Sequence, residues 1–410
     1  MKLQKFVTVQ AGARDRYQVP LAFAEQDLLE CFVTDAYRTK GLIGMLAGIS
    51  PGSSSRHHEG LATTSVVNDP MGFAMFAAEM LAKRIFMSQG LTDAAQRRKD
   101  HALSLRAFKE TFDNEAKLLA TSYYAGPAFQ KLLEHGQTGL LFQIHPEPKE
   151  LKKLYEEEME LQPLASSSLM AEREMQIGNE LLDDLAIESQ LAERIVVASS
   201  YTKDTLISQG IDPSKITICP YGVDFDRYRV RDFDTRPTGP LRIAFVGSVI
   251  QRKGLTYLLD AISRFSESSV EITFYTRTCP DKSVLARYSG KNIYLKEALS
   301  DTEVVAEMQH SDIFALPSIA EGFGHSLAEA MAVGLPAIAS FNTMGRDCIE
   351  DGVDGLLVPI RSTDAIEEKI SWAIQNRASL REMGRRASLK IRHFTWENFR
   401  AGIRNFACLH

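Results

Sequence analysis

This chain of 410 residues is too long for one compact core and suits two α/β domains. Hydrophobic residues make up 44% of it and charged residues 24%, which is the composition of an ordinary globular protein. The formal net charge of −6 at pH 7 gives no electrostatic reason to expect nucleic acid as the main partner. The cysteines form no Cys-x-x-Cys pair, and no apolar stretch of signal-peptide length follows Met1, so we expect a cytoplasmic protein.

The first half predicts strands that alternate irregularly with polar segments. These strands are Phe6–Val9, Leu29–Thr34, Lys117–Thr121, Leu140–Ile144, Arg194–Ala198 and Ile216–Ile218. Between residues 41 and 115 the pattern changes to a polar loop that includes residues 51–58, and then to helices. An insertion of this length often serves a specific substrate.

The helical part of this insertion carries a run of basic residues. They are Arg97, Arg98, Lys99, Arg106 and Lys109. They could form a basic face that meets anionic lipid or a phosphorylated acceptor, which would bring the protein to the inner face of a membrane. A solvated helix surface is the other interpretation.

The second half shows a clearer alternation. Strands are predicted at Leu241–Gly247, Val270–Tyr275, Ile293–Leu295, Ile313–Leu316, Pro336–Ser340 and Leu356–Val358, with helices between most of them. This spacing predicts a parallel, doubly wound sheet. Residues 231–240 contain two prolines and a glycine and are interpreted as a linker. We therefore predict domains over residues 1–230 and 241–393, followed by a helix over residues 394–410.

Two segments that follow strand ends in the second domain carry the chemistry. In Gly247-Ser-Val-Ile-Gln-Arg-Lys-Gly254, a glycine lets the backbone approach a ligand and Lys253 offers a point charge. In Glu321-Gly-Phe-Gly-His-Ser-Leu-Ala-Glu329, two carboxylates bracket a glycine turn and the start of a helix. The helix start can hold an anion, and the carboxylates can accept hydrogen bonds from sugar hydroxyls. In an open α/β sheet, ligands collect outside these strand ends.

This combination resembles the donor site of the retaining glycosyltransferases of family 4, the group 1 glycosyltransferases. The segments Pro220-Tyr-Gly-Val-Asp224 and Asp351-Gly-Val-Asp-Gly-Leu-Leu-Val-Pro359 add to the resemblance. It implies a GT-B fold, in which two Rossmann-like domains face each other across a cleft. It also implies that the C-terminal helix crosses back to the first domain, and that the donor lies on the second domain and the acceptor on the first.

The resemblance assigns roles within the donor site. Glu321 contacts the transferred sugar and Glu329 accepts hydrogen bonds from the ribose hydroxyls. Lys253 and Arg252 stabilise the charge on the leaving diphosphate. The donor also faces the strand end and the helix start, at Gly247, Ser248, Gly322, Phe323, Gly324, His325 and Ser326. The family usually has arginine in place of Ser248, so Arg252 could supply that phosphate contact instead.

In the first domain the resemblance holds only in outline. Gly12 stands where the family has a glycine pair and is the candidate on the acceptor side. His145 follows a strand that would end at the cleft, and it could donate to a sugar hydroxyl in catalysis. A histidine satisfied by the local backbone is the alternative.

Two Asp-Phe-Asp triplets, at residues 224–226 and 232–234, invite a metal interpretation. Glycosyltransferases of the other major fold use such a triplet to hold a divalent ion against the diphosphate. Here the triplets lie at the domain junction and in the linker, away from the strand ends. We therefore expect no metal and no cofactor.

These features predict a metal-independent enzyme of the hexosyltransferase type. It would move a sugar from a nucleotide-diphosphate sugar to a hydroxyl of a sugar, lipid or small-molecule acceptor. Two alternatives stay open: a catalytically inactive scaffold that binds a nucleotide sugar, and a same-fold 2-epimerase that acts on the nucleotide sugar itself. The motifs do not identify the base, the transferred sugar, the acceptor or the oligomeric state.

Overall fold

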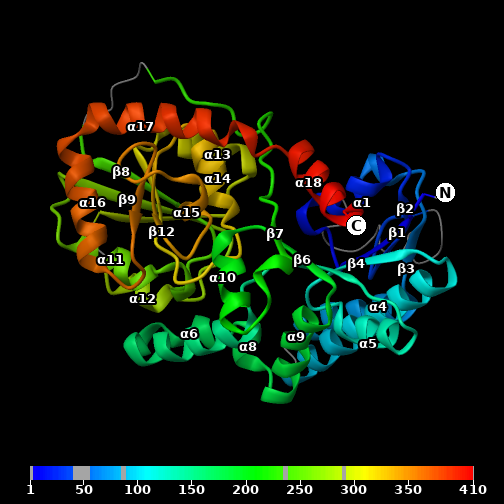
Figure 1. Cartoon of the computed structure of the whole chain (residues 1–410). Coiled ribbons are helices and arrows are strands. Elements are labelled where there is room, and N and C mark those ends of the chain that lie inside the picture. The colour runs from blue at the N-terminus through cyan, green and yellow to red at the C-terminus, as the bar shows by residue number, and fades with distance from the viewer. Residues whose placement is uncertain (1–2, 40–55, 85–88, 234–238, 289–291, 410) are drawn as a thin grey trace.

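The computed structural model describes residues 3–39, 56–84, 89–233, 239–288 and 292–409. They form two parallel sheets, each flanked by helices (Figure 1). The prediction of two Rossmann-like domains in a GT-B arrangement is confirmed. Residues 51–55 of the predicted polar loop and residues 234–238 of the predicted linker lie outside the described residues.

The first sheet has seven strands in the order β3-β2-β1-β4-β5-β6-β7. Their bounds are β1 Phe6–Val9, β2 Leu29–Thr34, β3 Val66–Asn68, β4 Lys117–Thr121, β5 Leu140–Gln143, β6 Arg194–Val197 and β7 Ile216–Ile218. All neighbouring pairs are parallel. The central strands are almost fully buried and mostly apolar, as a sheet covered by helices on both faces requires.

The second sheet has six parallel strands in the order β10-β9-β8-β11-β12-β13. Their bounds are β8 Leu241–Val246, β9 Val270–Thr276, β10 Ile293–Glu297, β11 Ile313–Leu316, β12 Ala337–Ser340 and β13 Leu356–Val358. The four side chains of β11 are fully buried, so this strand lies at the centre of the domain core.

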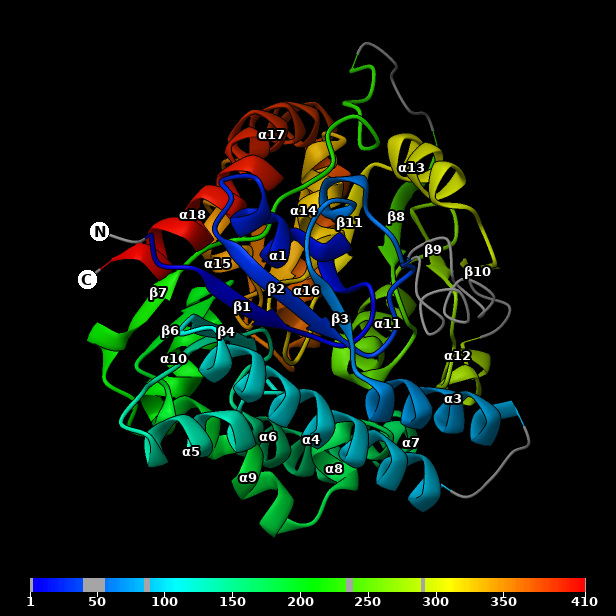
Figure 2. The same cartoon turned by 90° about the vertical axis from the view of Figure 1, so that its right-hand side faces the viewer.

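Helices cover both sheets. Those that precede the second sheet are α1 Gln18–Ala24, α3 Pro70–Arg84, α4 Gln89–Asp113, α5 Gly126–Glu134, α6 Pro148–Leu161, α7 Ser166–Met170, α8 Arg173–Gln176, α9 Asn179–Leu191 and α10 Ser200–Ser208. Those that follow β8 are α11 Leu255–Ser263, α12 Lys282–Ala286, α13 Asp301–His310, α14 His325–Ala332, α15 Gly345–Cys348, α16 Thr363–Gln375, α17 Arg377–Lys390 and α18 Trp396–Cys408. Figure 2 shows α3 and α4 side by side beneath the first sheet.

The C-terminal helix crosses back to the first domain, as predicted. After α17 the chain passes over to α18, which packs against α1 (Figure 1). Arg400 donates to the side chain of Gln18 at 2.7 Å, and Arg404 donates to the carbonyl of Ala22 at 2.9 Å. The crossing is tight, because a Cβ added at Gly222 would lie 2.2 Å from the backbone nitrogen of Trp396.

The segment from α6 to α8 belongs to the first half of the chain but lies against the second domain. Figure 1 shows α6 beneath α11 and α12, away from the first sheet. Ala165, which lies between α6 and α7, is fully buried in the apolar core of the second domain. The division at residues 231–240 stays a prediction. The helices α6 to α8 precede this division in sequence but pack against the second domain.

Two details of the first half differ from the sequence-based prediction. The insertion contains a short strand, β3, which pairs with β2 and was not predicted because three residues carry no clear period. The predicted basic face is also wrong in part, because Lys99 is buried and its ammonium donates to Gln96 at 2.8 Å.

None of the helices in the described ranges combines the length and the apolar character that crossing a bilayer requires.

Candidate active site

The carboxyl ends of the two sheets meet at Gly322. A Cβ added at Gly322 would lie 2.1 Å from the carbonyl oxygen of Ile144, which follows β5, so only glycine fits here. The carbonyl of Gly322 accepts hydrogen bonds from the hydroxyls of Ser199 at 2.6 Å and Thr202 at 3.2 Å. The predicted glycine turn is thus one of the points where the second domain contacts the first.

Glu321 lies between the two predicted cations. Its carboxylate is 2.9 Å from the guanidinium of Arg252 and 3.2 Å from the ammonium of Lys253. Burial alone would raise the pKa of the Glu321 carboxyl, but the two cations outweigh it and lower that pKa to about 2. The structure therefore brings Glu321 together with two adjacent cations from a much earlier segment of the chain.

The backbone fixes this cluster. Arg252 and Lys253 belong to a 3₁₀ turn, η6 Gln251–Lys253, which ends at Gly254 with φ +75°. A Cβ at Gly254 would lie 2.1 Å from the carbonyl oxygen of Pro317, so the turn lies directly against the segment after β11. The guanidinium of Arg252 also donates to the carbonyl of Ala320 at 2.9 Å.

The helix start predicted for anion binding is formed by α14. Gly324 precedes it with φ +97°, a conformation that side chains other than glycine rarely adopt. The first turn leaves the N–H groups of His325 and Ser326 without partners inside the helix. The Phe323 ring packs against Tyr221, with ring centroids 5.3 Å apart, and against His325 at the helix start, with ring centroids 5.2 Å apart.

A cavity of about 360 Å³ lies beside this helix in the second domain. Gly247, Ser248 and Glu329 line it, together with Arg227 and Tyr228. Burial raises the pKa of the Glu329 carboxyl, against the hydrogen bond from Tyr228, which lowers it. A nucleoside could bind in this pocket, because Glu329 supplies a hydrogen-bond acceptor and Gly247 lets a ligand approach the backbone at the end of β8.

A second cavity, of about 250 Å³, lies where the two domains meet. It is lined by Arg14, Gln96, Tyr123, Tyr124, His145, Pro146, Leu151, Tyr155, Glu172, Arg173, Glu174, Arg252, Ala320, Glu321 and Gly322. Burial, with the nearby charges of Arg14 and Arg252, lowers the pKa of His145 to about 3, so its imidazole is neutral near pH 7. Gly12 lines neither cavity, and its N–H donates to Asp35 at 2.9 Å.

Sequence reasoning missed two charged residues at the start of α8, Glu172 and Arg173. The Glu172 carboxylate accepts a hydrogen bond from Nε of Arg252 at 2.9 Å. Arg173 pairs with Asp100 at 2.8 Å and lies over the ring of Tyr123 at 4.4 Å. No local pattern could have found them, because their partners lie on other elements.

Among the described carboxylates of the Asp-Phe-Asp triplets, which are Asp224, Asp226 and Asp232, none lines either of these two cavities. Asp224 pairs with Arg16 at 3.1 Å, and Asp226 is exposed. Asp234 lies outside the described residues. In the part of the chain that the structure describes, no group of three or more side chains is placed to hold a metal ion.

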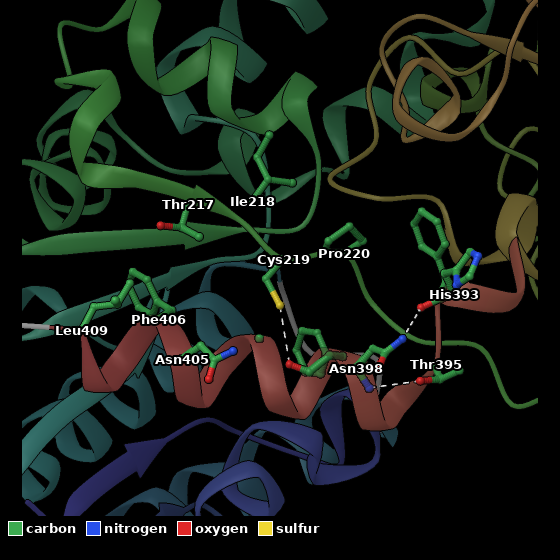
Figure 3. Close-up of a pocket in the computed structure, with 13 residues that line it drawn as sticks. Thr217, Ile218, Cys219, Pro220, His393, Thr395, Asn398, Asn405, Phe406 and Leu409 are labelled. Carbon is green, nitrogen blue, oxygen red and sulfur yellow. Dashed lines mark hydrogen bonds between the residues drawn. The ribbon is translucent and has the colours of Figure 1, made fainter. Parts of the chain in front are cut away.

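A third cavity, of about 340 Å³, lies between β7 and α18 (Figure 3). Its lining is mostly apolar, and Cys219 donates to the carbonyl of Phe399 at 3.5 Å across it. It contains none of the residues predicted for the site.

Comparisons with known proteins agree with this geometry. Residues 226–390 match the family described as glycosyl transferases group 1. The chain is 26% identical over 224 residues to the MMP alpha-(1->4)-mannosyltransferase of Mycolicibacterium hassiacum, covering 52% of this chain and 53% of that protein. It is 29% identical over 245 residues to the D-inositol 3-phosphate glycosyltransferase of Rhodococcus jostii, covering 52% and 51%. The chain thus aligns over about half the length of these curated relatives.

Solved structures share the fold over nearly the whole chain. Sucrose-phosphate synthase from Thermosynechococcus elongatus superposes with a TM-score of 0.69 at 14% identity, covering 99% of this chain and 98% of that one. Anabaena HepE in complex with UDP gives a TM-score of 0.63 at 13% identity, covering 98% and 99%. At this level of identity the likeness shows the fold alone.

Proposed function

Because residues 226–390 match the group 1 glycosyl transferase family, we propose that this chain moves a sugar from a nucleotide-diphosphate sugar to an acceptor hydroxyl, with retention of anomeric configuration. The acceptor is a sugar, a lipid or a small molecule. The observation that carries the proposal is the ion cluster of Glu321, Arg252 and Lys253 between two cavities.

The nucleoside would occupy the cavity at Glu329, with the ribose hydroxyls donating to that carboxylate. The diphosphate would then lie between Gly247 and the N-terminus of α14. A Cβ at Gly247 would meet the ammonium of Lys253 at 2.9 Å, which shows how close that cation lies to the strand end. The leaving charge would therefore develop beside Lys253, Arg252 and the free N–H groups of the helix start.

Without a donor, Glu321 neutralises much of the positive charge that a diphosphate needs. Donor binding would draw Lys253 and Arg252 toward the phosphates and leave Glu321 to accept hydrogen bonds from the transferred sugar. The acceptor hydroxyl would attack from the face that the diphosphate leaves, and its proton would pass to the departing phosphate oxygen. His145 is neutral and lines, together with Glu321, the cavity where the two domains meet, which we call the cleft cavity. Its imidazole can hydrogen-bond the sugar without adding charge.

The first test is a thermal-shift panel of nucleotides and nucleotide sugars. Uridine compounds come first, because Anabaena HepE, which shares the fold, was solved with UDP. A ligand at about a hundred times its dissociation constant stabilises a protein by about 2.7 kcal/mol, which is easily detected. If no nucleotide stabilises the protein, the proposal fails.

The second test separates the proposal from the scaffold and epimerase alternatives. With the nucleotide sugar that binds, Lys253→Ala and Glu321→Ala should each lower turnover, by about 2–4 kcal/mol of transition-state stabilisation for Lys253. A scaffold would bind the donor without turnover. An epimerase would release a 2-epimer without an acceptor. Near-normal kinetics in both variants would place the site elsewhere.

A further inference from the structure

The loop after β1 is held in an unusual conformation at the edge of the cleft. Asp15, Arg16 and Tyr17 have φ angles of 48°, 49° and 64°, three consecutive left-handed residues that are not glycine. Such conformations persist only where the surrounding structure fixes them, and they gather at functional sites. The two residues that follow Arg14 anchor the loop, since Asp15 lies 3.6 Å from His325 and Arg16 pairs with Asp224 at 3.1 Å.

Arg14, which opens this loop, lines the cleft cavity without an anionic partner. Within the described ranges no carboxylate lies at ion-pair distance from it, and its buried Nε has no hydrogen-bond partner. The other two arginines of the cavity are paired: Arg173 with Asp100 at 2.8 Å, and Arg252 with Glu172 and Glu321, each at 2.9 Å. A buried donor without an acceptor is unfavourable, so we expect an atom of a ligand to accept a hydrogen bond from Arg14.

None of the carboxylates that line this cavity pairs with Arg14. Glu174 accepts a hydrogen bond from the hydroxyl of Tyr123 at 2.5 Å. Glu172 and Glu321 are held by Arg252. Arg14 is therefore the cation of this cavity that is not already neutralised within the described part of the chain.

We propose that Arg14 binds an anionic group, a phosphate or a carboxylate, carried by the acceptor; this rests on the proposed function. A guanidinium presents its N–H groups as a planar fork that matches both oxyanions. Tyr124 and His145, which line the same cavity, follow strands of the first sheet, so this ligand would lie opposite the donor site. At about 250 Å³ the cavity is smaller than the ~300–1,000 Å³ typical of ligand pockets, which suits a small acceptor.

The test uses inorganic phosphate and acetate as probes, with the donor site saturated by the nucleoside diphosphate that the thermal-shift panel selects. The variants are Arg14→Gln, Arg14→Lys and, as the control, Arg38→Gln, because Arg38 is an exposed arginine of the first domain that lines neither of the two site cavities. Phosphate or acetate should raise the melting temperature of the wild type and of Arg38→Gln. Arg14→Gln should lose this shift and Arg14→Lys should keep part of it. The probe that acts identifies which oxyanion is preferred.

Sugar phosphates and sugar acids should then bind the wild type at least about tenfold more tightly than the matching neutral sugars, and Arg14→Gln should abolish that preference. An equal anion response in the wild type and in Arg14→Gln would overturn the inference, as would no response in the wild type. Circular dichroism and nucleotide affinity show whether each variant is folded. If nucleotides bind and only the anion result is negative, the inference fails while the proposed function stands; if no nucleotide binds, the proposed function itself fails.

Discussion

Glu172, from the first half of the chain, holds Arg252 of the second domain through a hydrogen bond of 2.9 Å. Two further contacts reach the same turn, because Gln251 donates from its side chain to Glu158 at 2.7 Å and from its N–H to the hydroxyl of Ser168 at 3.0 Å. The turn that presents Arg252 is therefore held in part by residues from outside its own domain. If the domains open, α6 to α8 either move with the second domain or lose these buried contacts.

Glu158→Ala should destabilise the protein and weaken donor binding. Glu158 is 0% exposed and also accepts from Arg361 at 2.7 Å, so its loss removes a hydrogen-bond acceptor from both Gln251 and Arg361. Breaking a buried ion pair costs about 3–5 kcal/mol, and we expect the lower end because Arg361 is partly exposed. Chemical denaturation and nucleotide titration would measure both effects. Glu157→Ala is the matched control, since Glu157 pairs with the same arginine but is 46% exposed and should contribute little.

His145→Gln should make the protein less sensitive to acid. The pKa of His145 is lowered to about 3 in the folded state, whereas an unfolded histidine titrates near about 6.5. Between these values the unfolded chain binds the extra proton, so wild-type stability falls as the pH drops through this window. The free energy of unfolding, measured against pH, should fall less steeply in the variant. The exposed His393→Gln serves as control, and equal slopes for wild type and His145→Gln would contradict the assignment.

Glu329→Gln should raise the KM for the donor and leave kcat nearly unchanged, because ribose contacts are equal in the ground and transition states. Burial raises the pKa of Glu329 above its ordinary value. The affinity of the wild type for a nucleoside diphosphate should therefore fall as the pH decreases through that raised pKa. The amide does not titrate, so calorimetry across the acidic range should show a flatter dependence in the variant. A purely catalytic defect would argue against the ribose contact.

Exhaustive chelation should leave transfer activity intact. The proposed charge stabilisation comes from Lys253, Arg252 and the start of α14, which need no divalent ion. Activity would be assayed after dialysis against a chelator, and again after adding magnesium or manganese. Loss on chelation with recovery on metal addition would show that a metal site was overlooked.

The sequence predicted what depends on local pattern. Buried parallel strands such as Ile313–Leu316 read as apolar runs, and the glycine turn after Glu321 stands out by its spacing. The contacts of Glu172 and Arg14 could not be predicted, because they depend on how distant elements meet. The burial of Lys99 was missed for the same reason, since a run of basic residues looks alike whether a neighbouring helix covers it or not.

The position of α6 to α8 has a consequence for protein engineering. A chimera that joins residues 1–230 of this chain to the second domain of a relative would set Glu158 and Ser168 against a foreign surface. Glu158 would then remain buried without Gln251 and Arg361, its present partners. A graft that carries residues 147–177 together with the second domain keeps this interface intact. The portion to exchange in order to change donor preference is therefore discontinuous along the chain.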